Sequence, residues 1–272
     1  MNSTEPAPKP GSIQVLHRAA ALLDVLAEAR RPVSLTQLAR AVGLNKSTVL
    51  NILATMASLG LVFVDPETRQ YRLGPKVLRL GSAFEASFSI ADVAKPALVA
   101  TRDVTGETAS LHVRVGSERT CIAQEQGVHP LRRVIELGRK RPLYSGSAGF
   151  VLLAELTDED VLAYLDRVEI IPFTQNTLTD RDRLLTVVRG VRRDGYSAVF
   201  EDTEPGAAAV GVPIRDHSDA VRAVLVVSGP SIRFDRKAIA DAVPFMQRQA
   251  ADVSRQLGWL SPQDPAATAV SS

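Results

Sequence analysis

One change in hydrophobic periodicity, at Gly60, constrains the fold of the first 75 residues more than any other feature of the sequence. Before Gly60, apolar side chains recur every three or four residues, which predicts three amphipathic helices. These predicted helices cover residues 12–29, 35–42 and 46–59. After Gly60, the short apolar run 61–64 and the alternating run 70–73 lie on either side of a turn, which predicts a β-hairpin. Three helices followed by a hairpin are typical of a winged helix-turn-helix, which we expect to span residues 12–74.

Residues that begin and end helices support these boundaries. Ser34 and Gln37 have the spacing of a capping box, and Asn45 is a good N-cap for the third predicted helix. Ala39 is small where the second and third helices would touch, and Gly43 lies four residues later in the turn. This spacing matches the packing pattern of a helix-turn-helix.

The exposed side of the third predicted helix is polar and carries no carboxylate, which suits a surface that faces DNA phosphates. We therefore predict that this helix and two arginines of the hairpin contact DNA. The predicted DNA-binding residues are Lys46, Ser47, Thr48, Asn51, Thr55, Arg69 and Arg72. The alternatives are a solvated helix face and arginines that only add solubility.

Charge is distributed unevenly along the chain. Residues 1–80 contain ten lysines and arginines against five acidic residues, whereas the remainder contains 22 against 25. A basic first module therefore precedes a part of the chain that has another task. No segment is apolar enough to span a membrane, and one cysteine with four scattered histidines makes neither a disulfide nor a convincing metal site. We expect a cytoplasmic protein without a metal, a cofactor or a membrane partner.

Beyond the hairpin, residues 75–89 are predicted to form a linker helix, and residues 90–258 a second domain of the α+β class with an antiparallel sheet. Residues 1–11 and 259–272 are expected to be disordered tails. The predicted strands of the second domain are 109–115, 120–124, 131–137, 196–201, 208–214 and 220–228. Its predicted helices are 90–104, 148–156, 158–168, 180–193 and 235–257.

Short segments along both domains resemble the IclR-type bacterial transcriptional regulators. LNKSTV at 44–49 with LATM at 53–56 resembles that family's recognition helix, and YRLG at 71–74 resembles the end of its wing. The further landmarks, in chain order, are GRKRPL at 138–143, AG with LLA at 148–154, RDGY at 193–196, PIRD at 213–216 and VSGP at 227–230. The resemblance implies a winged helix, a linker helix and a GAF-like effector domain. It also implies homodimers or homotetramers that bind double-stranded operator DNA and a small-molecule effector.

The sequence also departs from the family pattern. Asn51 stands where members often carry an arginine, so a different base preference is expected. In the acid-sensing members the ligand is held by an acidic residue, a cysteine and two serines, and only one of the four matching positions is polar here. These positions are Val199, Ala209, Val226 and Ser228. We therefore expect an apolar or aromatic effector, or none. The remaining predicted pocket residues are Leu143, Ser145, Gly146, Ser147 and Ala148.

The alternative function is an enzyme or ligand carrier that uses the α+β domain, with the helix-turn-helix as a protein-interaction module. Ser147 lies in a segment similar to a nucleophile elbow, but a serine occupies position 145, where G-x-S-x-G requires glycine. Cys121 is interpreted as a buried structural thiol, and residues 158–160 as charge in the first turn of a helix. The basic run 139–141 suits either an anionic effector or a solvated loop. We predict a regulator that is not an enzyme, and a repressor rather than an activator.

Overall fold

The structure is a computed structural model that describes residues 13–29, 31–86 and 89–260. The chain divides after residue 88 into two compact units. Among the described helices, none is both long and apolar enough to cross a membrane. The predicted tail 1–11 lies outside the described residues, as does most of the tail 259–272.

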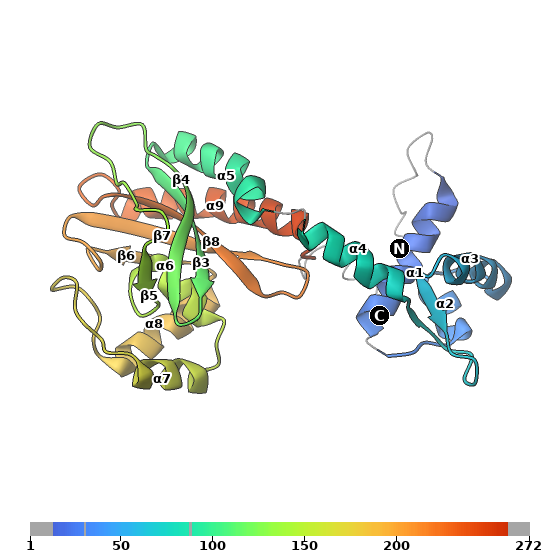
Figure 1. Ribbon diagram of the computed structural model, residues 1–272. Helices are drawn as coiled ribbons and strands as arrows, with labels where there is room; N and C mark the ends of the chain where they lie inside the picture. Colours follow the sequence, from blue (N-terminus) through green and yellow to red (C-terminus); the bar gives the residue numbers. More distant parts are fainter. Residues whose placement is uncertain (1–12, 30, 87–88, 261–272) are drawn as a thin grey trace, which may run out of the picture. The chain divides into compact units, whose positions relative to one another are not determined.

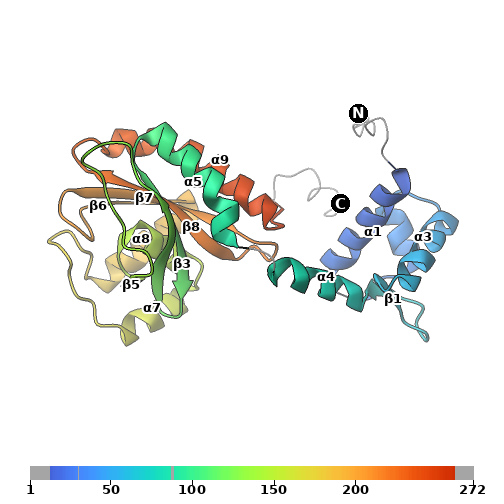
Figure 2. The ribbon, with the colours of Figure 1, turned by 45° about the horizontal axis from the view of Figure 1, so that its top comes forward.

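The first unit contains the predicted three helices and hairpin (Figures 1 and 2). Its elements are α1 (Gln14–Ala29), α2 (Leu35–Ala41), α3 (Lys46–Ser58), β1 (Val62–Val64), β2 (Tyr71–Leu73) and α4 (Pro75–Ala86). The capping box is confirmed, since Ser34 Oγ accepts the N–H of Gln37 and the Gln37 amide oxygen accepts the N–H of Ser34. The N-cap of α3 is confirmed as well, because Asn45 Oδ1 accepts the N–H of Thr48 at 2.8 Å.

The core of this unit is formed by the apolar sides of the three helices and the hairpin. Leu22, Leu38, Val49 and Leu53 are fully buried in it. Glycine is required at position 74, at the exit from the hairpin, because a Cβ there would lie 2.3 Å from the Gly60 carbonyl oxygen. The hairpin therefore closes tightly against the turn that ends α3.

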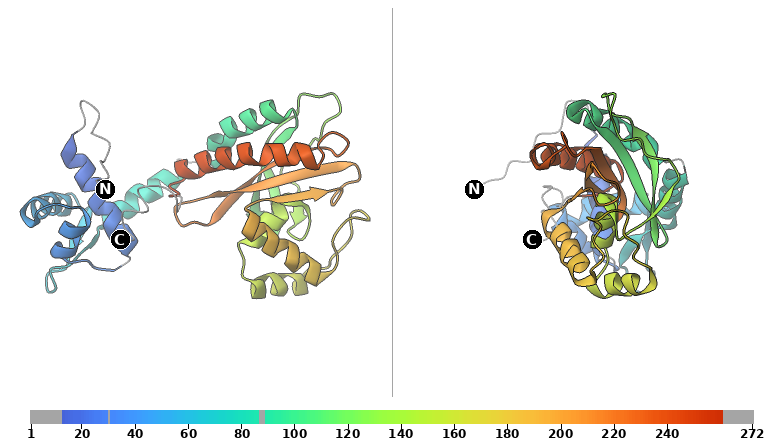
Figure 3. Two further views of the ribbon diagram at one scale, coloured as in Figure 1. Left: turned by 180° about the vertical axis from the view of Figure 1, so that it is seen from behind. Right: turned by 90° about the vertical axis from the view of Figure 1, so that its left-hand side faces the viewer.

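The second unit is an antiparallel sheet of six strands in the order β5-β4-β3-β8-β7-β6, with α5 and α9 on one face and α6, α7 and α8 on the other (Figures 1 and 3). The strands are β3 (Thr108–Val115), β4 (Glu118–Glu125), β5 (Lys140–Pro142), β6 (Ser197–Phe200), β7 (Ala207–Arg215) and β8 (Val221–Pro230). The helices are α5 (Ile90–Thr105), α6 (Gly146–Ala154), α7 (Asp158–Arg167), α8 (Arg181–Asp194) and α9 (Arg236–Gln256). The α+β class predicted from the sequence is confirmed.

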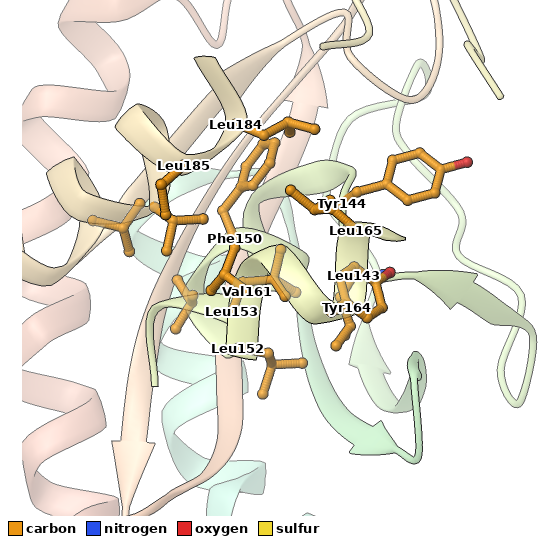
Figure 4. Packing of buried hydrophobic residues seen from close by; sticks show 14 of the residues in the cluster. Leu143, Tyr144, Phe150, Leu152, Leu153, Val161, Tyr164, Leu165, Leu184 and Leu185 are labelled. Carbon is orange, nitrogen blue, oxygen red and sulfur yellow. The ribbon is translucent and has the colours of Figure 1, made fainter. Parts of the chain in front are cut away.

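Helix α6 is the centre of the core on its face of the sheet. Every residue of the helix before Ala154 is buried, because α6 packs against the sheet on one side and α8 on the other. Figure 4 shows Phe150 beside Leu184 within this cluster. Glycine is required at position 149, where a Cβ would lie 2.3 Å from the carbonyl oxygen of Leu143. The start of α6 is thus fixed against the chain that precedes it.

One predicted strand is wrong. Residues 131–137 form no strand, and the edge of the sheet is instead the short β5. The backbone of this segment is satisfied by side chains, since the Gln124 amide accepts from the N–H of Ile135 at 3.0 Å and donates to its carbonyl at 2.6 Å. Thr108 Oγ1 also donates to the carbonyl of Arg133 at 2.6 Å. These contacts replace a strand ladder, so the apolar and β-branched residues of this segment alone overestimated the sheet.

Candidate functional site

The predicted DNA-binding residues of α3 lie at its start and along one side. Ser47, Asn51 and Thr55 recur every four residues, which places them on one helix face, and all three are exposed. Lys46, the first residue of the helix, is exposed as well, whereas Thr48 is half-buried. No aspartate or glutamate occurs in α3. The helix therefore presents hydroxyl, amide and ammonium groups without a carboxylate that would repel phosphate.

Two hydroxyls of this face are already held by the helix. Ser47 Oγ donates to Asn45 Oδ1 at 2.8 Å, and Thr55 Oγ1 donates to the carbonyl of Asn51 at 3.1 Å. Lys46 and Asn51 carry the longer side chains of the set. We therefore expect these two to reach furthest toward a ligand of this surface.

The hairpin positions one of its two predicted arginines by stacking. Phe63 and Arg72 are directly paired across β1 and β2, and the Arg72 guanidinium lies 4.5 Å from the centre of the Phe63 ring. Phe63 remains 38% exposed, so the stacked pair forms part of the hairpin surface. Arg69 lies in the turn with a φ of 56° and is also exposed. The hairpin thus offers two cations beside a helix that offers polar groups.

The second unit contains a cavity of about 300 Å³ between the sheet and the start of α6. Seven of the nine predicted effector residues line it, and these are Gly146, Ser147, Ala148, Val199, Ala209, Val226 and Ser228. Leu143 and Ser145 do not line it. Leu143 is fully buried, with its N–H donated to Tyr164 Oη at 2.8 Å, and Ser145 is the buried N-cap of α6.

Strand pairing brings the matched positions together. Ala209 on β7 is directly paired with Val199 on β6 and with Ser228 on β8. Directly paired residues of an antiparallel sheet project from the same face, so these three side chains form one row. Val226 lies two residues before Ser228 and shares that face. Residues about 30 apart in the sequence therefore form one wall of the cavity.

The sequence analysis missed a buried arginine in this cavity. Arg119 on β4 is 8% exposed, and its Nε and Nη2 donate to the carbonyl of Ser145 at 3.3 and 3.2 Å. Burial lowers the pKa of Arg119 to about 10, so the side chain is still charged at neutral pH. Arg119 lies just outside the predicted strand 120–124, and the hydrophobic pattern of the sequence gave no indication that its side chain is buried at the cavity.

A buried histidine orients this arginine. Arg119 Nη1 lies 3.4 Å from His112 Nδ1, and an arginine can only donate, so Nδ1 is the acceptor. The histidine proton is thereby assigned to Nε2, which donates to Ser110 Oγ at 3.0 Å. Burial, reinforced by the charge of Arg119, lowers the pKa of His112 to about 3. The side chain is therefore neutral throughout the physiological range.

Asp202 is a second buried ionisable group at the cavity. Its carboxylate accepts the N–H of Gly146 in the first turn of α6, and Ser145 makes no side-chain capping bond there. Burial raises the pKa of Asp202, opposed by hydrogen bonds from the N–H groups of Gly146 and Leu178 and by the charge of Arg119. Gly146 thus has two buried charged groups as neighbours. Asp202 accepts its N–H, and a Cβ at this residue would be 2.4 Å from Arg119 Nη2.

The expectation of an apolar pocket is wrong. The four positions matched to the family anchors supply only one wall, and other elements supply charged side chains. The charged residues that line the cavity are Arg119, Arg133, Arg139, Arg141, Glu136, Asp202 and Glu204. Cys121 also lines it, and burial raises the pKa of its thiol to about 11, which argues against a reactive thiolate.

A winged helix-turn-helix with a carboxylate-free exposed helix, followed by an α+β unit with a polar cavity, defines the class of DNA-binding transcriptional regulators. The family of the IclR helix-turn-helix domain matches residues 15–66, and the family described as bacterial transcriptional regulator IclR C-terminal matches residues 84–255. The chain therefore belongs to the IclR family of bacterial transcriptional regulators.

Individual relatives match over nearly the whole chain. The HTH-type transcriptional regulator XynR of Escherichia coli K12 is 30% identical over 247 residues, which are 91% of this chain and 98% of that protein. The crystal structure of a putative IclR transcriptional regulator from Silicibacter sp. TM1040 has a TM-score of 0.81 at 25% identity, over 92% of this chain and 98% of that one. The crystal structure of the Agobacterium tumefaciens repressor BlcR has a TM-score of 0.73 at 25% identity, over 92% and 99%. These relatives favour a regulator over the alternative of an enzyme or ligand carrier.

Proposed function

We propose that this protein is a sequence-specific repressor that binds operator DNA through α3 and the hairpin. The observation that carries the proposal is the exposed row of Ser47, Asn51 and Thr55 on α3, without any carboxylate on the helix. An α-helix fits the major groove, and an asparagine there can make a bidentate contact with adenine. The hairpin arginines Arg69 and Arg72 neutralise phosphates beside the groove. The repressor assignment is supported by the name of BlcR.

The DNA-binding form is a homodimer or an assembly of dimers. The side of α4 formed by Val77, Leu80 and Phe84 is apolar; Val77 is half-buried and Leu80 is 52% exposed, so this side keeps an apolar surface within its own subunit. We assign residues 75–89 as the linker and place this apolar side of α4 against the partner's α4. Phe84, the third apolar residue expected on this side, has a side chain outside the described part of the chain. A two-fold dimer reads two half-sites, so the operator is a pseudo-palindrome.

The cavity at the start of α6 is the proposed effector site. A small molecule can release the operator only if it binds the DNA-free arrangement of the dimer more tightly than the DNA-bound one. Buried polar side chains at the cavity, such as Ser228, provide contacts that such a ligand needs. The effector therefore acts from the second unit on the DNA affinity of the first.

Fluorescence anisotropy with DNA from upstream of the protein's own coding region, titrated with salt, tests the DNA-binding proposal. Lys46→Ala should weaken binding to every sequence and reduce the salt slope by about one, because one phosphate contact is lost. Asn51→Ala should cost about 1–3 kcal/mol on the operator and relax the preference at one base pair per half-site. Lys95→Ala, which removes an exposed lysine from α5, is the matched control and should behave as the parent. Parental binding and salt dependence in both α3 variants would show that another surface binds DNA.

A further inference from the structure

An apolar strip lies beside the polar row of α3. The strip consists of Leu50 and Ala54, which are four residues apart and therefore share one side of the helix. Leu50 lies three residues after Ser47. Ala54 lies three residues after Asn51, so the strip and the polar row are neighbours on the helix surface. Leu50 is 46% exposed and Ala54 is exposed as well, so the exposed face of α3 has a polar and an apolar part.

The core of the first unit does not use this strip. The residues of α3 that are buried in the core are Val49, Ile52, Leu53 and Met56. Within the described residues, Leu50 belongs neither to this core nor to the half-buried apolar residues that pack against it. Single exposed leucines are common on protein surfaces. The position of Leu50 among the DNA-binding residues, rather than its exposure alone, therefore carries the argument.

The charges around the strip favour a nucleic acid as the partner of this surface. Lys46 begins the helix, the hairpin adds Arg69 and Arg72, and all three side chains are exposed. The helix itself contains no aspartate or glutamate. Cations at the edge of a surface are complementary to the phosphates that border the major groove of DNA. On the base edges within that groove, the apolar group is the C5-methyl of thymine.

We propose that Leu50 and Ala54 select thymine by burying its C5-methyl group in the major groove, next to the adenine that Asn51 contacts. This inference rests on the proposed DNA-binding function and adds the residues that select a second base. Neighbouring side chains on a helix lie about 5–6 Å apart, so the strip and the polar row reach the same or adjacent base pairs. Cytosine carries no methyl at C5, so the apolar strip discriminates between the two pyrimidines. Leu50 is then a specificity-determining residue.

Two versions of one DNA fragment test the proposal before the operator is mapped. The fragment upstream of the protein's own coding region is copied once with dTTP and once with dUTP. Uracil lacks the methyl of thymine but keeps every hydrogen-bonding group of the base. In fluorescence anisotropy, the full-length protein should bind the uracil fragment about tenfold more weakly, because one buried methyl is worth about fourfold and a dimer reads two half-sites. Equal binding of the two fragments would overturn the proposal.

Three variants assign the contact. Leu50→Ala should weaken binding to the thymine fragment only, so the preference for thymine over uracil should fall from about tenfold to about threefold or less. Leu50→Met keeps an apolar side chain of similar size and should keep most of the preference. Leu59→Ala is the matched control, because Leu59 is 50% exposed and follows the end of α3, about 13 Å further along the helix axis. An unchanged preference in Leu50→Ala would mean that uracil acts through DNA shape or another residue, and would contradict the assignment.

Salt dependence separates this apolar contact from a phosphate contact. Burial of a methyl group releases no counterions, so Leu50→Ala should keep the salt slope of the parent protein. Lys46→Ala should instead reduce that slope by about one and leave the preference for thymine over uracil unchanged. A reduced slope in Leu50→Ala would show that the substitution moves the helix away from the phosphates, and would overturn the methyl contact as the cause of weaker binding.

Stability and assembly separate a DNA-reading role of Leu50 from a structural one. Leu50 lies outside the core, so the thermal midpoint of Leu50→Ala should stay within about 3 °C of the parent and its sedimentation should be unchanged. A larger drop would identify Leu50 as structural, and a weaker dimer would assign it to a subunit interface.

The outcomes also distinguish this inference from the proposed function. A protein that binds both fragments equally, and both more tightly than unrelated DNA, refutes the thymine contact alone. A protein that binds neither fragment more tightly than unrelated DNA refutes the proposed function, and the thymine contact with it.

Discussion

The buried neutral state of His112 makes the stability of the second unit depend on pH in a predictable way. Its pKa is about 3 in the folded protein, against an ordinary value of 6.5. Between these values the unfolded chain binds a proton that the folded chain does not, so stability falls as the pH decreases from 6.5 toward 3. From pH 7 to pH 5, this one group should lower the free energy of unfolding by about 2 kcal/mol.

Urea unfolding followed by tryptophan fluorescence measures this effect. The chain has one tryptophan, Trp259, whose indole N–H donates to Asp219 at 2.7 Å, so its fluorescence reports on the second unit. His112→Gln keeps a donor and an acceptor but cannot titrate. The free energy of unfolding that is lost between pH 7 and pH 5 should therefore be smaller by about 2 kcal/mol in this variant than in the parent.

The exposed His129 provides the matched control. His129→Gln removes a titratable group of the same kind from the surface, and its pH dependence should follow that of the parent. All other ionisable groups are common to the three proteins and cancel in the comparison. The same loss of stability between pH 7 and pH 5 in His112→Gln as in the parent would refute the assignment of a neutral, buried histidine.

Two further predictions concern packing and assembly. Gly149→Ala places a methyl group 2.3 Å from the carbonyl oxygen of Leu143, so the second unit should lose on the order of 2–4 kcal/mol in the same urea assay; a loss below about 0.5 kcal/mol would contradict the tight contact. Leu80→Glu on the full chain should weaken the dimer at micromolar concentration in analytical ultracentrifugation, because it puts a charge on the exposed apolar side of α4. The exposed Leu59→Glu serves as its control, and an unchanged dimer in Leu80→Glu would place the subunit interface elsewhere.

The sequence by itself determined the first unit almost completely. Two of its helices, α2 and α3, begin directly after Ser34 and Asn45 because these side chains accept N–H groups three residues later, and such contacts depend only on the neighbouring chain. Its core follows from apolar side chains that recur every three or four residues along each helix. The polar, carboxylate-free side of α3 was visible for the same reason.

Only the tertiary structure decided the character of the cavity. The carboxylate that caps α6 comes from Asp202, 56 residues after Gly146, and the arginine that faces it comes from Arg119, 26 residues before Ser145. No local period links such residues, because strand order and loop paths bring them together. The four matched positions lie along one wall of the cavity, but its charge is set by side chains of other elements, and these contacts exist only in the folded chain.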